Sequence, residues 1–271
     1  KLNFLGYLKL IKTCANKRSD LEQEIRKQFF SSHSNTTINK TTEDNQAKLA
    51  MNCFLSLRSY GLIETDPLKP KEYIITKLSI DLLNMNTPDE QIREFAKHIL
   101  VNLCGTDLLK AIESVNERGM RPTLGAIIAE LNEMGYVLSK NSVYPSTMRQ
   151  WLTLAGLFEG KYKIAWDLFY ELTEIDKDFI DALYRLTPEQ KYFLISLLEL
   201  QVTTFQGWPK ILEHTSMTKH LDYDMKMFPA KVLDPLNALG IIEFSKTTDG
   251  RGAKPNKVRL TKKGESDYLI P

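Results

Sequence analysis

Two stretches of the chain carry amide and cationic side chains on the polar face of an expected helix. The first stretch contributes Asn45, Gln46, Lys48 and Asn52, and the second contributes Arg149 and Gln150. Such side chains form paired hydrogen bonds with base edges, Asn and Gln with adenine and Arg and Lys with guanine. The pattern therefore predicts two helices that read bases, although it equally suits the solvated face of any amphipathic helix.

A second set of residues suits further contacts with DNA, namely with phosphate and sugar from the polar segment and the C-terminal loop, and along a groove from the N-terminal arm. It comprises a basic N-terminal arm, a polar segment, the turn and first residues of the second helix, and a basic loop near the C-terminus. The arm and the polar segment contain Asn3, Lys9, Lys12, Lys17, Arg18, His33, Ser34, Asn35, Thr36, Thr37, Asn39 and Lys40. The other two places contain Lys140, Asn141, Ser142, Tyr144, Ser146, Thr147, Arg251, Lys254 and Lys257. A surface loop without a role is an equal interpretation of the polar segment.

Catalytic chemistry has little support in the sequence. Asp224 and Lys226 have the short spacing found in some nuclease motifs, but they lie in a polar turn before Phe228-Pro229. The four histidines do not pair at the spacing of metal ligands, and we find neither a glycine-rich phosphate loop nor a nucleophile elbow. We expect no catalytic residue, no metal site and no cofactor in this chain.

A repeated sequence pattern, in which a helix ends at glycine and a strand follows, indicates the elements that position these residues. Three times a leucine-rich helical stretch ends in glycine and continues with an apolar pair, at Gly61, Gly156 and Gly240. Glycine ends helices because it adopts the left-handed conformation without penalty, and the following pair favours a strand. Such joints are frequent in α+β proteins, but repetition favours three winged helices, each a helix-turn-helix followed by a β hairpin.

The sequence therefore predicts a mainly α fold with small β wings (α+β), built from tandem winged-helix subdomains joined by linker helices. We expect boundaries at 1–85 for the arm and first subdomain, 86–186 for linker helices and a second subdomain, and 187–271 for a third with a basic wing. Helical periodicity predicts helices over 20–30, 43–60, 86–105, 107–117, 123–134, 145–155 and 166–186. Ser19, Thr87 and Thr187 are expected N-caps, and Pro235 should shorten the third reading helix.

Composition limits the class of protein. The 271 residues are 42% hydrophobic and 26% charged, which is typical of globular proteins, and no apolar run could cross a membrane. The net charge is only +2, but residues 1–40 hold eight Lys or Arg against three acids. Three widely spaced cysteines suggest reduced, buried thiols and a cytoplasmic protein. Because the chain starts without Met or a signal peptide, we expect it to be a fragment.

Tandem winged helices with a basic arm and no active site resemble the DNA-recognition half of type IIS restriction endonucleases. The resemblance covers most of the chain and implies binding to a short asymmetric site in double-stranded DNA, as a monomer and without a membrane partner. It implies a separate nuclease domain, absent from this chain, which would need a divalent metal such as Mg²⁺. The alternatives are a winged-helix transcription regulator or replication initiator, and a winged-helix scaffold for protein interactions.

Overall fold

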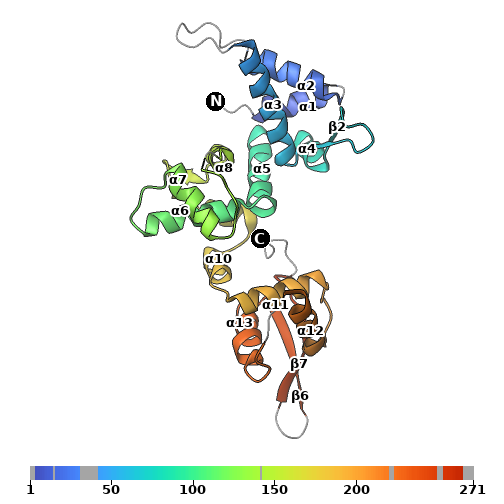
Figure 1. Cartoon of the computed structure of the whole chain (residues 1–271), viewed down its shortest axis with the longest axis vertical. Helices are drawn as coiled ribbons and strands as arrows, with labels where there is room; N and C mark the ends of the chain where they lie inside the picture. Colours follow the sequence, from blue (N-terminus) through green and yellow to red (C-terminus); the bar gives the residue numbers. More distant parts are fainter. Residues whose placement is uncertain are drawn as a thin grey trace. The chain divides into compact units, whose positions relative to one another are not determined.

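The computed structural model of the chain describes residues 4–14, 16–30, 42–140, 142–219, 223–248 and 253–264, without the side chains of 246–248 and 253–256. It is mainly helical, with small antiparallel sheets, as predicted. The chain divides into two compact units, Lys1–Thr173 and Glu174–Pro271 (Figure 1). The division into three subdomains remains a prediction. Within the described ranges, no helix is both long and apolar enough to cross a membrane.

The first unit contains nine α-helices, one π-helix and two hairpins among its described residues. In chain order they are α1 (Phe4–Thr13), α2 (Arg18–Ile25), η1 (Arg26–Phe30), α3 (Glu43–Ser59), β1 (Ile63–Thr65), β2 (Tyr73–Ile75), α4 (Lys77–Leu83), α5 (Pro88–Asn102), α6 (Gly105–Glu117), α7 (Leu124–Glu133), α8 (Tyr144–Leu154), β3 (Phe158–Glu159), β4 (Lys163–Ile164) and α9 (Trp166–Thr173). Helix α5 packs against α4, α6, α8 and α9, so it joins the two halves of this unit.

The second unit contains four α-helices, one π-helix and one sheet in its described part. They are α10 (Lys177–Tyr184), α11 (Pro188–Glu199), β5 (Gln206–Gly207), α12 (Trp208–Lys219), η3 (Pro229–Leu233), α13 (Asp234–Ala238), β6 (Ile242–Thr248) and β7 (Ala253–Leu260). The sheet has the order β5-β7-β6, and both pairings are antiparallel.

Three segments share one order of elements, helix, helix, helix, hairpin, and we call them the first, second and third repeats. The first runs from α1 to β2, the second from α6 to β4, and the third from α11 to β7. In the third repeat, β5 lies between the first two helices and pairs with the last strand. In the first repeat, an isolated bridge between Lys17 and Glu72 joins the corresponding positions. The hairpin of the second repeat is the shortest of the three, because β3 and β4 have two residues each.

The glycine joints that end α3, α8 and α13 have one geometry. Gly61, Gly156 and Gly240 have φ of 71°, 90° and 70°, in the left-handed region that the sequence predicts. At each joint the amide after the glycine donates to a carbonyl five residues back, as from Leu62 to Leu57 at 2.9 Å. The chain therefore leaves all three helices in the same direction relative to their last turn.

A threonine hydroxyl secures two of these joints. The Thr76 hydroxyl donates to the carbonyl of Gly61 at 2.7 Å, and the Thr261 hydroxyl donates to that of Gly240 at 2.6 Å. Each hydroxyl also accepts from the amide three residues later, at Ser79 and Gly264. In the second repeat Ala165 occupies this place, and only its backbone amide bonds to Leu157.

Some sequence predictions of local structure are confirmed and others are wrong. Thr87 and Thr187 are the N-caps that the sequence predicts, and each forms a capping box with Glu90 or Gln190. The cap at Ser19 is wrong, because α2 begins one residue earlier without a side-chain cap. The continuous helix over 166–186 is also wrong: it breaks into α9 and α10 near Glu174, whose φ is 60°. The three cysteines are free, but Cys104 is exposed and not buried as expected.

An aromatic cluster forms the core where the first and second repeats meet. Its members are Phe4, Tyr60, Phe95, Tyr144 and Trp151. Tyr60 follows the last residue of α3 and Tyr144 is the first residue of α8, and their rings stack at 5.6 Å between centroids. The end of one expected reading helix therefore contacts the start of the other. Trp151 is buried, as the sequence suggests for a core residue.

Candidate nucleic-acid interface

Helix α3 exposes most of the residues predicted to read bases. Asn45, Lys48 and Asn52 are exposed along it, while Ala50, Phe54 and Leu57 of the opposite face are buried. Gln46 is half-buried, and its side-chain carbonyl accepts from Arg26 Nε at 3.4 Å. The helix is capped by Thr42 and has Glu43 and Asp44 in its first turn. These two carboxylates would repel a phosphate near this end of the helix.

Helix α8 presents a different electrostatic surface. No Asp or Glu occurs between residues 134 and 158, a stretch that includes the loop before α8, the whole helix and its joint. Gln150 is exposed, while Ser146 and Thr147 are half-buried, and the Thr147 hydroxyl donates to the carbonyl of Val143 at 3.1 Å. Lys140 is exposed in the preceding loop and Ser142 is half-buried there. This helix therefore offers polar groups to an anionic partner without a nearby carboxylate in its own segment.

The loop before α8 is held by one side chain. The Asn132 amide nitrogen donates to the carbonyl of Leu138 at 3.1 Å, and the amide of Leu138 donates back to Asn132 Oδ1 at 2.8 Å. The amide of Ser142 then donates to the carbonyl of Ser139 at 2.9 Å. These bonds fix the path on which Lys140 lies, so the loop is positioned before any partner binds.

Two predicted DNA contacts, Arg18 and Arg149, already have partners within the protein. Arg18 Nε lies 2.7 Å from Glu22 Oε1, and its guanidinium stacks 4.9 Å from the ring of Phe54. Arg149 Nη1 donates to the carbonyl of Lys161 at 3.1 Å, and its guanidinium lies 5.0 Å from the ring of Tyr162. Both arginines are partly buried and are held in place by these contacts.

The remaining predicted residues fall into two groups. Lys9 and Lys12 are exposed on α1, Lys17 is exposed before α2, and Lys257 is exposed on β7. Tyr144 is 36% exposed beside its stacking partner Tyr60. The other residues lie outside the described residues, or, for Lys254, have a side chain outside them: Asn3, His33, Ser34, Asn35, Thr36, Thr37, Asn39, Lys40, Asn141, Arg251 and Lys254.

Sequence reasoning missed Lys161, an exposed cation on the turn between β3 and β4. This turn is tied to two helices, because Asn116 Nδ2 of α6 also donates to the carbonyl of Tyr162, at 3.2 Å. A signal that could have identified Lys161 is its position directly after Gly160, in the hairpin expected after Gly156. Lys163, the other lysine of this hairpin, is paired with Glu159.

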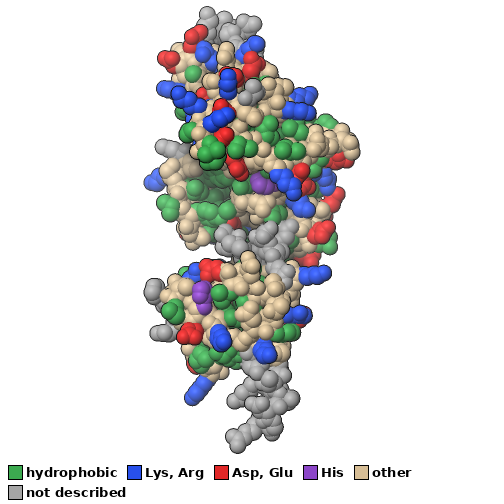
Figure 2. All heavy atoms as spheres, turned by 90° about the vertical axis from the view of Figure 1, so that its right-hand side faces the viewer, with side chains coloured by type: hydrophobic (Ala, Val, Ile, Leu, Met, Phe, Trp, Pro, Cys, Tyr) green, Lys and Arg blue, Asp and Glu red, His purple; other side chains and the backbone are tan. Residues whose placement is uncertain are grey.

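The charges of the first unit do not form a continuous basic surface on the face that Figure 2 presents. Lys and Arg side chains there stand among Asp and Glu side chains. Within this unit, Lys and Arg side chains also form ion pairs with acids, among them Lys69 with Glu72 at 3.2 Å and Lys27 with Glu24 at 3.6 Å. Affinity for a polyanion would therefore depend on a few local cations, such as those around α8, and not on the field of the whole unit.

Burial shifts the pKa values of three groups beside the expected reading helices. Desolvation raises the pKa values of Tyr60 and Tyr144, so both hydroxyls keep their protons at physiological pH. Desolvation lowers the pKa of His98, against smaller opposing effects of hydrogen bonds to Tyr60 and Asn102. His98 Nε2 is buried without a hydrogen-bond partner. This histidine is therefore neutral at neutral pH.

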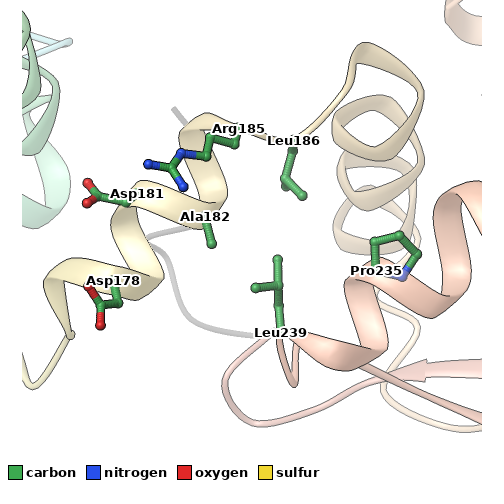
Figure 3. Close-up of a pocket in the computed structure, with 7 residues that line it drawn as sticks. All are labelled: Asp178, Asp181, Ala182, Arg185, Leu186, Pro235 and Leu239. Carbon is green, nitrogen blue, oxygen red and sulfur yellow. The ribbon is translucent and has the colours of Figure 1, made fainter.

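The second unit contains a pocket of about 440 Å³ between α10 and α13. Figure 3 shows Ala182, Leu186 and Leu239 turned toward this space, which Asp178 and Asp181 of α10 also line. Lys177 pairs with Asp181 at 2.8 Å. This pocket lacks the converging nucleophile and base that a catalytic site requires.

A metal centre is likewise missing from the part of the chain that the structure describes, where no three His, Cys, Asp or Glu side chains are grouped to hold an ion. No family model matches this chain, and neither a curated protein nor a solved structure matches it.

Proposed function

We propose that this chain binds double-stranded DNA sequence-specifically through tandem winged helices, as the recognition module of a type IIS restriction endonuclease. The proposal assigns base reading to α3 and α8 and phosphate contacts to the exposed lysines around them. It places the protein on DNA as a monomer in the cytoplasm, with cleavage performed by a separate nuclease domain that uses a divalent metal.

The order and pairing of the elements support the winged-helix part of this proposal. A strand between the first two helices that pairs with the last strand of the hairpin is expected of a winged helix. The third repeat has this arrangement in β5-β7-β6, and the first repeat has it as the bridge between Lys17 and Glu72. The third helix of each repeat then precedes the hairpin, which is the position of a recognition helix.

The observation that carries the proposal is the acid-free segment around α8. An exposed Gln150, the adjoining Ser146 and Thr147, and an exposed Lys140 lie on a stretch without any carboxylate from residue 134 to 158. An ordinary solvated helix face usually carries both signs of charge. Amide, hydroxyl and ammonium groups without acid suit hydrogen bonding to bases and phosphates.

A protein-interaction scaffold is the second candidate, and exposed apolar side chains of the second unit favour it. Met217, Met225 and Met227 are 72%, 53% and 45% exposed. Exposed methionines are common at surfaces that bind varied protein partners, because the side chain adapts its shape. The two candidates differ in one measurable property, since only DNA binding weakens steeply with salt.

The test is selection of bound duplexes from a random pool, followed by titration of the selected duplex at several salt concentrations. Enrichment of one short asymmetric motif is expected, together with an affinity that falls steeply as salt rises. A palindromic motif would instead indicate a dimeric regulator. Binding without any enriched motif would reduce the function to phosphate attraction, and no binding would leave the scaffold.

A further inference from the structure

The sequence predicts that Arg149 reads bases, but its contacts within the protein favour a role in positioning the hairpin. Its guanidinium donates to the carbonyl of Lys161 at 3.1 Å and lies 5.0 Å from the ring of Tyr162. Both partners belong to the turn that joins β3 to β4, so Arg149 connects α8 to its own hairpin. A guanidinium held by a hydrogen bond and a ring loses part of its freedom to follow a base edge.

Lys161 stands on the turn that Arg149 holds. It is exposed, and its ammonium lies 5.6 Å from the ring of Tyr162, the ring that also faces Arg149. From the other side, Asn116 donates to the carbonyl of Tyr162 at 3.2 Å. The turn of this very short hairpin is therefore fixed by α6 and α8 together, although its strands contribute only two residue pairs.

We propose that Arg149 is a positioning residue that holds the β3–β4 turn so that Lys161 contacts a DNA phosphate, while the exposed Gln150 beside it reads bases. This inference rests on the proposed function. It concerns Lys161 because the hairpin's other lysine, Lys163, is paired with Glu159. A phosphate contact from a fixed turn sets the register in which α8 meets the bases.

The test compares Arg149→Ala, Lys161→Ala and the double variant on the selected duplex and on an unrelated duplex of equal length. Each single variant should lower affinity on both duplexes by a similar factor, leaving the preference between them unchanged within about twofold. Each should also reduce the slope of log affinity against log salt by about one, the value for one lost phosphate contact. In the double variant the slope of log affinity against log salt should also fall by about one in total.

Three results would overturn the inference. A loss of preference in Arg149→Ala would make Arg149 a base reader. A slope reduced by about two in the double variant would give Arg149 a phosphate of its own. Unchanged affinity in Lys161→Ala would show that Lys161 does not contact a DNA phosphate. Arg149→Met keeps the length of the side chain without its charge or donor, and should behave as Arg149→Ala does if only the hydrogen bond and the cation matter.

A second measurement does not involve DNA. In the free protein, backbone order parameters of Lys161 and Tyr162 should fall in Arg149→Ala and stay unchanged in Gln150→Ala. Unchanged order at both residues in Arg149→Ala would overturn the positioning role even if DNA binding were lost. Absence of salt-dependent binding by the unsubstituted protein would overturn the proposed function and the phosphate contact, whereas the order parameters would still report on the turn.

Discussion

At the scale of single residues, the surroundings of a side chain decide which chemistry it can perform. Asn52 and Gln150 are exposed on α3 and α8, whereas Arg18, Gln46 and Arg149 have partners within the protein. An exposed amide keeps its donor and acceptor available for a base edge. An arginine fixed to a carboxylate or a carbonyl must lose that contact before it can bind elsewhere, which lowers the net gain.

Replacement of Asn52 or Gln150 by alanine should therefore affect sequence preference. We expect each change to cost about 1–3 kcal/mol on the selected duplex and little on random DNA, because only base contacts distinguish sequences. Titration of both duplexes measures this difference. Gln23→Ala removes an equally exposed amide from α2 and should change neither affinity. Equal losses on both duplexes would contradict base reading by that residue.

His98 should make the stability of the first unit depend on pH. Its pKa in the folded protein lies below the usual 6.5, so between these two values the unfolded chain binds more protons than the folded chain. The free energy of unfolding should therefore fall as pH drops below about 6.5 and continue to fall until the pKa of the folded state is reached. Chemical denaturation at several pH values measures it.

His98→Gln is the matched variant, because glutamine has similar size and does not titrate. The difference in the free energy of unfolding between the two proteins should change with pH below about 6.5 and be constant above it. A constant difference over the whole range would show that His98 has the same pKa folded and unfolded.

At the scale of elements, the glycine joints set the direction in which each hairpin leaves its helix. All three glycines have positive φ, and equivalent backbone bonds close all three joints. Gly119, which lies after α6 and is not one of these joints, has a similar φ but less crowded surroundings. A Cβ atom at Gly61 would lie 3.3 Å from His98 Nε2, whereas a Cβ at Gly119, with φ of 69°, would meet nothing within 4 Å. Comparison of these two glycines separates backbone strain from packing.

Gly119→Ala should destabilise the first unit by about 1 kcal/mol, the cost of placing alanine in the left-handed conformation. Gly61→Ala should cost more, because it carries the same strain at φ of 71° and also displaces His98. Thermal unfolding of both variants tests the order. Equal losses would mean that His98 moves aside without cost, and the extra contact would then have no energetic weight.

At the scale of the whole molecule, the chain forms two units with separate cores. The first is centred on α5 and the aromatic cluster around Phe95 and Trp151, and the second on Phe193, Trp208 and Phe228. The break between α9 and α10 falls at the boundary between these units. Each unit therefore has the buried apolar surface that independent cooperative unfolding requires.

Trp151→Ala should lower the stability of the first unit by about 3–5 kcal/mol, the usual cost of removing a large buried ring. The unfolding transition of the second unit should stay in place. Calorimetry can follow both unfolding transitions. Leu197→Ala, which removes a fully buried side chain from α11, should shift only the transition of the second unit. If either change moved both transitions equally, the two units would unfold as one.

The sequence by itself determined several helices of the first unit, the N-caps at Thr87 and Thr187 and the three glycine joints. These features follow from hydrogen bonds and backbone preferences within a few residues, as at Thr87, Thr187 and Gly240. It also supplied the candidate reading residues, of which Asn45, Lys48, Asn52 and Gln150 are exposed on helices.

Only the tertiary structure decided which of those residues have their polar groups already engaged. The stack of Tyr60 on Tyr144 and the bond from Arg149 to Lys161 join elements that are separate in the sequence. Such contacts depend on where whole elements come to rest, and local periodicity carries no information about distances between them.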